Sequence, residues 1–195
     1  MGQVKPGEFR VGRSAGPLVD LAGLGLVPRI LFATDGTITH ILEAYAGELI
    51  DLVRLDSSMM VDVLNRRELG IEPGERALRR LSLLRGRESR SVFVHADSVV
   101  VLDRLPEGVA DDLVNTGTSL LKLLSGQRIG TFRESIGEWT GTAPNVSAYF
   151  DLGPSEVLVA RTYQVVIGGR PVAWITESFP RYGFSSVAAG LDPGR

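Results

Sequence analysis

The chain has 195 residues, of which 44% are hydrophobic and 23% are charged, values close to the average of globular proteins and far from those of disordered or coiled-coil chains. Its 21 basic and 23 acidic side chains give a formal net charge of −2, so the positive excess that nucleic acids demand is missing. The absence of cysteine excludes disulfides, thiolate metal sites and catalytic thiols.

Length and composition together predict one domain with one hydrophobic core. We expect a flexible leader over residues 1–16, a single domain over 17–184 and a frayed tail over 185–195. No apolar run approaches the roughly 18–20 residues that span a bilayer. We therefore expect a cytoplasmic protein that has neither a membrane nor a nucleic acid as its partner.

The N-terminal third of the chain carries helical signals. The apolar residues of 17–33 predict one or two short helices. The turn pair Asp35-Gly36 then precedes apolar residues that recur at helical spacing as far as Tyr45. Gly47 is placed to end this second predicted helix.

Strand signals dominate the region that follows. Alternation through Leu49, Asp51, Val53 and Leu55 predicts a strand over 48–60, and the stretch 65–75 is rich in turn residues. Two further strands, 80–84 and 91–101, are separated by a short polar stretch. This spacing predicts an antiparallel hairpin.

The C-terminal half begins with two predicted short helices, 106–115 and 118–125. Its clearest feature comes later, where two β-rich runs, 157–167 and 171–179, flank Gly168-Gly169. A two-glycine turn between such runs is typical of an antiparallel hairpin. Strands that arrive as neighbouring hairpins predict an α+β fold with an antiparallel sheet rather than βαβ repeats.

Common catalytic and cofactor motifs are missing from the sequence. It contains no GxxxxGK[ST], GxSxG or HExxH, and Gly23-Leu24-Gly25 lacks the third glycine of a dinucleotide fingerprint. His95 and Asp97 could face the same side of a strand, but two ligands do not complete a metal site. We therefore predict no metal and no cofactor, and we interpret His95 as an ordinary strand residue.

Ionisable residues inside apolar strands are the more informative feature. Glu177 and Arg161 lie within the two runs of the predicted hairpin, and Arg80 begins another strand. Such residues either face solvent or turn inward, where buried charges need a partner or a polar ligand. An inward arrangement would suit a small organic acid, because arginine binds carboxylates and glutamate accepts hydrogen bonds from hydroxyls.

Several short motifs recur in the order of a known family. They are TDGTIT before a helix, Arg80 at the start of a strand, Ala96-Asp97-Ser98-Val99-Val100, Ile129-Gly130, and the final ARTYQVVIGGRPVAWITESFP. In order and spacing this set resembles the chorismate pyruvate-lyases, especially the actinobacterial 4-hydroxybenzoate synthases. The resemblance extends from about Leu31 to Pro180.

The resemblance implies an antiparallel sheet with helical flaps that enclose a buried pocket. It also implies a reaction that removes pyruvate from chorismate to leave 4-hydroxybenzoate, without metal or cofactor. The residues that match the family's ligand contacts are Arg80, Glu177 and two backbone positions, Ile38 and Ile129, the latter beside Gly130. Arg161 is then predicted as a second anion contact or as the partner of Glu177.

Some alternatives remain open at this level. Arg79 competes with Arg80, and Asp97 stands where other branches of the family carry a basic residue, which leaves the second anion contact in doubt. Residues 137–149 match nothing in the family, and Glu177 could act as a base or only position the substrate.

Two rival functions are considered. One is an enzyme that forms a different hydroxybenzoate, and the other is the effector-binding domain of a GntR-type regulator. Such a regulator needs a DNA-binding domain, for which the stretch before Leu31 is too short and not basic enough.

Overall fold

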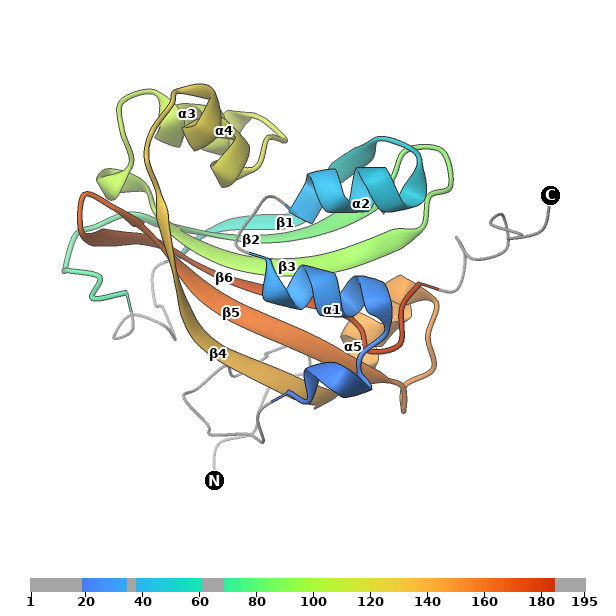
Figure 1. Ribbon diagram of the computed structural model, residues 1–195. Helices are drawn as coiled ribbons and strands as arrows, with labels where there is room; N and C mark the ends of the chain where they lie inside the picture. Colours follow the sequence, from blue (N-terminus) through green and yellow to red (C-terminus); the bar gives the residue numbers. More distant parts are fainter. Residues whose placement is uncertain (1–18, 35–37, 61–68, 185–195) are drawn as a thin grey trace.

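The computed structural model describes residues 19–34, 38–60 and 69–184, which form a six-stranded antiparallel sheet with helices on both faces (Figure 1). The strand order is β1-β2-β3-β6-β5-β4, so two three-stranded meanders are joined where β3 pairs with β6. The strands are β1 (Ile50–Met60), β2 (Ala77–Gly86), β3 (Val92–Val101), β4 (Phe132–Thr142), β5 (Val157–Ile167) and β6 (Arg170–Pro180). The predicted α+β class with an antiparallel sheet is confirmed.

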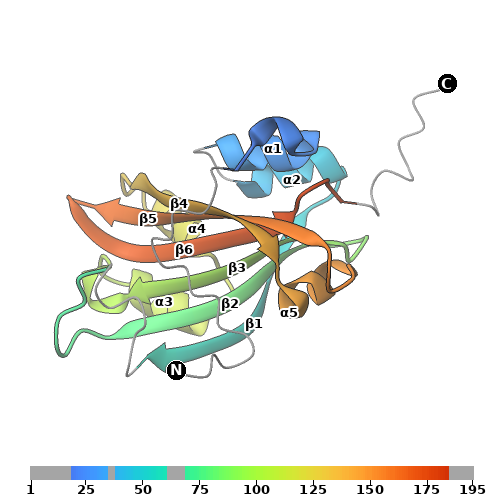
Figure 2. The same ribbon diagram turned by 90° about the horizontal axis from the view of Figure 1, so that it is seen from below.

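Four helices cover one face of the sheet, and a fifth packs on the other (Figures 1 and 2). We call the face under α1–α4, which carries Ser82, Ala96 and Glu177, the inner face, and the opposite one the outer face. Among the described residues no helix is long and apolar enough to cross a membrane. The helices are α1 (Leu26–Ala33), α2 (Ile38–Ala46), α3 (Val109–Asn115), α4 (Leu120–Gly126) and α5 (Pro144–Ser147), with the single turns η1 (Leu21–Gly23), η2 (Leu102–Arg104) and η3 (Ala148–Phe150).

The hairpin predicted around two glycines is confirmed. β5 and β6 pair with Ile167 opposite Arg170, and Gly168 and Gly169 have φ values of +57° and +80°. Both values lie in the left-handed region, which a two-residue hairpin turn requires and which glycine adopts without a steric penalty. This turn sets the register that brings the inward residues of β5 and β6 side by side.

Helix α2 confirms the second predicted helix, and Gly47 follows it with a φ of +69°. Ile38 and Leu42, four residues apart, are buried on its inward side. Its Tyr45 ring contacts Phe93 and Phe184, with centroid distances of 6.3 and 6.0 Å. Helices α1 and α2 are thereby anchored over one end of the inner face. The predicted turn at residues 35 and 36 lies outside the described residues.

Helices α3 and α4 form a second unit, over the other end of the inner face. Val109, Leu113, Leu120 and Leu124 point into a core that also contains Val165 of β5. The Ser119 hydroxyl caps α4 by accepting a hydrogen bond from the Lys122 amide at 3.2 Å. Helix α3 begins later than predicted because residues 106–108 form a turn.

Some sequence-based boundaries were wrong. The strand predicted over 48–60 is confirmed as β1. β2 extends beyond the predicted 80–84 at both ends, because it pairs along its whole length with β1 and β3 and alternation alone does not show how far that ladder continues. Residues 137–149, which matched no family pattern, form the end of β4, α5 and the start of η3. The predicted leader, residues 1–16, and tail, residues 185–195, lie outside the described residues.

Arg104 holds the segment before β2 against the sheet. Its buried guanidinium donates to the carbonyls of Leu69 and Pro171, both at 2.7 Å, and forms two hydrogen bonds with Glu75 at 2.9 and 2.6 Å. The hydrogen bonds from Arg104 to the Glu75 carboxylate are the main reason that the pKa of Glu75 falls from its ordinary 4.5 to about 2. The folded state therefore stabilises the charged form of Glu75 more than the unfolded state does.

We expect Arg104→Met to lower the free energy of unfolding by about 3–5 kcal/mol. The change removes the donor of the Leu69, Gly70 and Pro171 carbonyls and leaves Glu75 with only the more exposed Arg170 and the Glu72 amide. Urea unfolding at pH 7 measures this loss. Arg76→Gln is the matched control, since the Arg76 side chain is 61% exposed in its pair with Asp103 and should contribute little to stability. Equal losses in the two variants would contradict the assignment.

The same pair predicts a pH dependence. Because its folded pKa is depressed, Glu75 contributes stability that is fully present above pH 4.5 and is lost as the pH falls towards 2. Arg104→Met should show less of this acid-induced loss than the wild type.

Candidate active site

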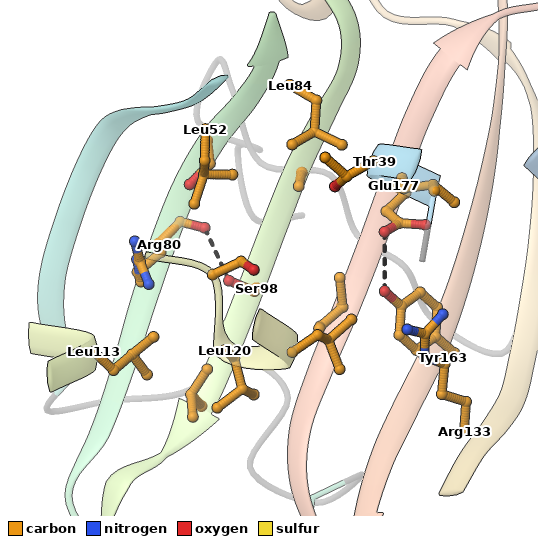
Figure 3. Close-up of a pocket in the computed structure, with 17 residues that line it drawn as sticks. Thr39, Leu52, Arg80, Leu84, Ser98, Leu113, Leu120, Arg133, Tyr163 and Glu177 are labelled. Carbon is orange, nitrogen blue, oxygen red and sulfur yellow. Dashed lines mark hydrogen bonds between the residues drawn. The ribbon is translucent and has the colours of Figure 1, made fainter. Parts of the chain in front are cut away.

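A cavity lies between the inner face of the sheet and helices α2, α3 and α4 (Figure 3). Its volume is about 740 Å³ counted together with its opening to solvent. Leu113 and Leu120 of the α3–α4 unit lie on one side, and Leu52 and Leu84 on another. The walls are mainly apolar, which weakens competition from water for any polar contact inside.

Small residues form the floor of this cavity. Ser82 of β2 pairs with Ala96 of β3, and two residues further on Arg80 pairs with Ser98. Strand side chains alternate between faces, so these four residues all face inward. Because three of them are short, the space above the centre of the sheet is left open for a ligand.

Arg80 borders the cavity from β2 and is only 4% exposed. Its Nη1 donates to the Thr118 carbonyl at 3.0 Å, whereas Nε and Nη2 are buried without a hydrogen-bond partner among the described residues. Burial, with a smaller effect of the nearby Arg54 charge, lowers the pKa of Arg80. Two unmet donors on one planar group match the two oxygens of a carboxylate.

Arg79 faces the other way. On the outer face its Nε and Nη2 bind the two carboxylate oxygens of Asp97 at 3.1 and 2.7 Å. The structure therefore places Arg80, and not Arg79, at the cavity. Asp97, which stands where other branches of the family carry a basic residue, also turns away from the cavity.

His95 shares the outer face with Asp97. Its ring stacks on Tyr149 at a centroid distance of 5.6 Å, and burial lowers the pKa of the imidazole. No cluster of three or more potential metal ligands occurs in the described part of the chain.

Glu177 borders the cavity from β6 and is 6% exposed. Arg161, opposite it on β5, donates from Nε to Oε2 at 2.8 Å, and the Tyr163 hydroxyl donates to Oε1 at 2.9 Å. Arg161 also donates from Nη1 to the Thr34 carbonyl at 2.7 Å. Of the two roles considered for Arg161, the geometry matches that of partner to Glu177.

Arg161 itself lies beside the main cavity. It lines a smaller, more polar hollow, about 490 Å³ with its opening, next to Thr34, Ser135 and Glu138. Its Nη2 is buried without a hydrogen-bond partner among the described residues.

The predicted backbone contacts divide into two groups. Ile38, in the first turn of α2, lines the cavity. Ile129 and Gly130 are not among its lining residues, and the Ile129 amide instead donates to the Leu124 carbonyl at 2.9 Å behind α4. Contact between these two residues and a ligand remains a sequence-based prediction.

Tyr163 and Arg133 are among the cavity residues that sequence reasoning missed. Tyr163 stands two positions after Arg161, so the two-residue period of a strand could have placed it on the same face. Arg133 comes from edge strand β4, and its guanidinium lies 5.5 Å from the centre of the Tyr163 ring. Nothing local in the sequence indicates that β4 reaches this site.

The architecture is shared with several solved structures. The crystal structure of PhnF from Mycobacterium smegmatis superimposes with a TM-score of 0.61 over 78% of this chain and 68% of that chain, at 14% identity. The effector domain of the same protein gives 0.58, over 74% of this chain and 88% of that chain, also at 14% identity. A GntR-family transcriptional regulator from Enterococcus faecalis gives 0.51 over 68% and 96%, at 11% identity. At these identities the likeness establishes the fold alone, an α+β fold with an antiparallel sheet.

Sequence comparison narrows this class to one family. The family model described as "Chorismate pyruvate-lyase Rv2949c-like" matches residues 32–184. Proteins named chorismate pyruvate-lyase from Mycobacterium tuberculosis and Mycobacterium leprae are each 34% identical, over 78% and 82% of this chain and 79% and 76% of theirs. The chain therefore belongs to the chorismate pyruvate-lyase family, a family of lyases, which confirms the resemblance drawn from its motifs.

The two buried arginines should differ in their effect on stability. We expect Arg80→Met to change the free energy of unfolding by less than about 1 kcal/mol, or to raise it, because two unmet buried donors disappear. Arg161→Met should lower it by about 3–5 kcal/mol, because Glu177 loses its charged partner in the interior. Denaturant unfolding without ligand measures both changes, and a large loss in Arg80→Met would show that the guanidinium has a structural role.

Proposed function

We propose that this protein removes pyruvate from chorismate to yield 4-hydroxybenzoate, without a cofactor. One observation carries the proposal: a buried guanidinium with unmet donors and a buried carboxylate with one donor on each oxygen border the same largely apolar cavity. Membership of the chorismate pyruvate-lyase family supports it.

The spacing of the two groups suits this substrate. Arg80 pairs with Ser98 of β3 and Glu177 pairs with Ala96, so their backbones are separated by two strand spacings, about 10 Å, across the sheet and by two residues, about 7 Å, along it. Chorismate carries a ring carboxylate and, on the far side of its ring, a C4 hydroxyl. In our proposal Arg80 binds the ring carboxylate, Glu177 accepts a hydrogen bond from the C4 hydroxyl, and the ring lies over Ala96 and Ser98.

The chemistry then needs little from the protein beyond orientation. The C4 proton leaves, its bonding electrons form the C3–C4 double bond of the aromatic ring, and the C3–O bond breaks. The departing enolate of pyruvate takes up a proton on its methylene carbon. Aromatisation drives these steps without a metal or redox group. The cavity contributes a fixed geometry and exclusion of water.

Incubation with chorismate tests the proposal directly. We expect equimolar pyruvate and 4-hydroxybenzoate, with rates unchanged by a chelator, measured by coupled pyruvate assay and chromatography. Formation of another hydroxybenzoate isomer would favour the related-enzyme alternative. Binding of chorismate without turnover would favour a small-molecule sensor, the second candidate, which the likeness to the regulators' effector domain supports.

Steady-state kinetics test the residue roles. Arg80→Met should weaken 4-hydroxybenzoate binding by about 10- to 100-fold, because it removes hydrogen bonds to a charged group worth roughly 1.5–3 kcal/mol. Glu177→Gln should lower kcat by about 100-fold through loss of substrate orientation. Arg79→Gln is the matched control, since its neighbouring guanidinium lies on the outer face, and it should retain activity within about twofold. Normal activity in Arg80→Met or Glu177→Gln would overturn the corresponding role.

A further inference from the structure

The Glu177 carboxylate has one donor on each oxygen. Arg161 reaches Oε2 through Nε, while Tyr163 reaches Oε1 through its hydroxyl. An arginine can also bind a carboxylate with two parallel hydrogen bonds, using Nε and one terminal nitrogen. Here the second of these hydrogen bonds is absent, and Arg161 Nη2 is buried without a hydrogen-bond partner among the described residues. The Tyr163 hydroxyl thus takes the oxygen that a two-point Arg161–Glu177 pair would use.

Tyr163 is fixed in the position that this contact requires. It pairs with Ile175 on β6, so Glu177 is its diagonal neighbour, within reach of an aromatic side chain. Its ring is 5% exposed and packs in the core beneath α3 and α4. The guanidinium groups of Arg133 and Arg161 lie 5.5 and 5.6 Å from the ring centre, a further constraint on its orientation.

The hydroxyl also keeps its proton. Complete burial, with the nearby Glu177 charge, raises the pKa of Tyr163 well above its ordinary value. The phenol therefore remains protonated and serves as the donor over the whole working pH range.

We infer that Tyr163 is a positioning residue, which holds Glu177 in single-point contact with Arg161 and so keeps the carboxylate turned to the cavity. The inference rests on the proposed lyase function. Without the hydroxyl, Oε1 is free to turn towards Arg161 Nη2, where a two-point pair would satisfy that buried donor. The carboxylate would then be drawn towards β5 and away from the substrate hydroxyl.

Tyr163→Phe is the direct test, because it keeps the ring and its cation contacts and removes only the donor. We expect kcat to fall by at least tenfold, KM to stay within threefold, and the midpoint of thermal unfolding to change by no more than a few degrees. A residue with a merely structural role would show the opposite pattern, an altered midpoint with kcat unchanged.

A double-mutant cycle establishes whether the effect passes through Glu177. The Tyr163→Phe/Glu177→Gln double variant should be no slower than Glu177→Gln alone, within threefold, because the acceptor has already been changed. Thr176→Val is the control for loss of a buried hydroxyl next to Glu177. The Thr176 hydroxyl pairs with that of Thr162 at 3.0 Å, away from the cavity, so kcat should be normal.

The outcomes separate this inference from the proposed function. Absence of chorismate turnover in the wild type would overturn both. Turnover in the wild type together with normal kcat in Tyr163→Phe, or with losses that multiply in the double variant, would overturn the role of Tyr163 alone.

Discussion

The buried ion pair between Arg161 and Glu177 is the interaction on which the rest of the site depends. It joins β5 to β6 at the centre of the inner face and, through the Thr34 carbonyl, ties the sheet to the end of α1. Two charges can stay in the interior only because each has a close partner and additional hydrogen bonds. The pair therefore fixes a negative group beside an apolar cavity, at a place where a lone carboxylate would not be tolerated.

Arg80 differs from this pair, because its buried donors are not all satisfied within the described part of the protein. Its guanidinium is as deeply buried as Glu177, yet two of its nitrogens have no acceptor among the described residues. Such a group lowers stability and is explained by a ligand that supplies the missing acceptors. Arg104 provides the contrast, because that guanidinium is fully used in holding Glu75 and neighbouring carbonyls. Arg104 thus serves the structure, whereas Arg80 is available for recognition.

Much of the site could be anticipated because it depends on local rules. The glycine pair defines the β5–β6 hairpin, and the two-residue period then places Arg161 and Glu177 on one face. The order of the motifs identified the family. Tyr163 obeyed the same period but was missed, since an isolated tyrosine in a strand gives no sign of its hydrogen-bond partner. Arg133 could not be found, because its place beside Tyr163 depends on how edge strand β4 pairs with β5.

The sequence by itself determined the α+β class, the hairpins, the family and the candidate charged residues, since all of these follow from side-chain periodicity, turn chemistry and motif order. It left open whether those residues face inward. Only the tertiary structure decided that β3 lies beside β6, which sets the distance between Arg80 and Glu177. It also decided which arginine faces the cavity, because burial depends on where α2, α3 and α4 pack. Strand pairing and helix packing are long-range outcomes that no local pattern encodes, and they convert a set of plausible residues into one enclosed site.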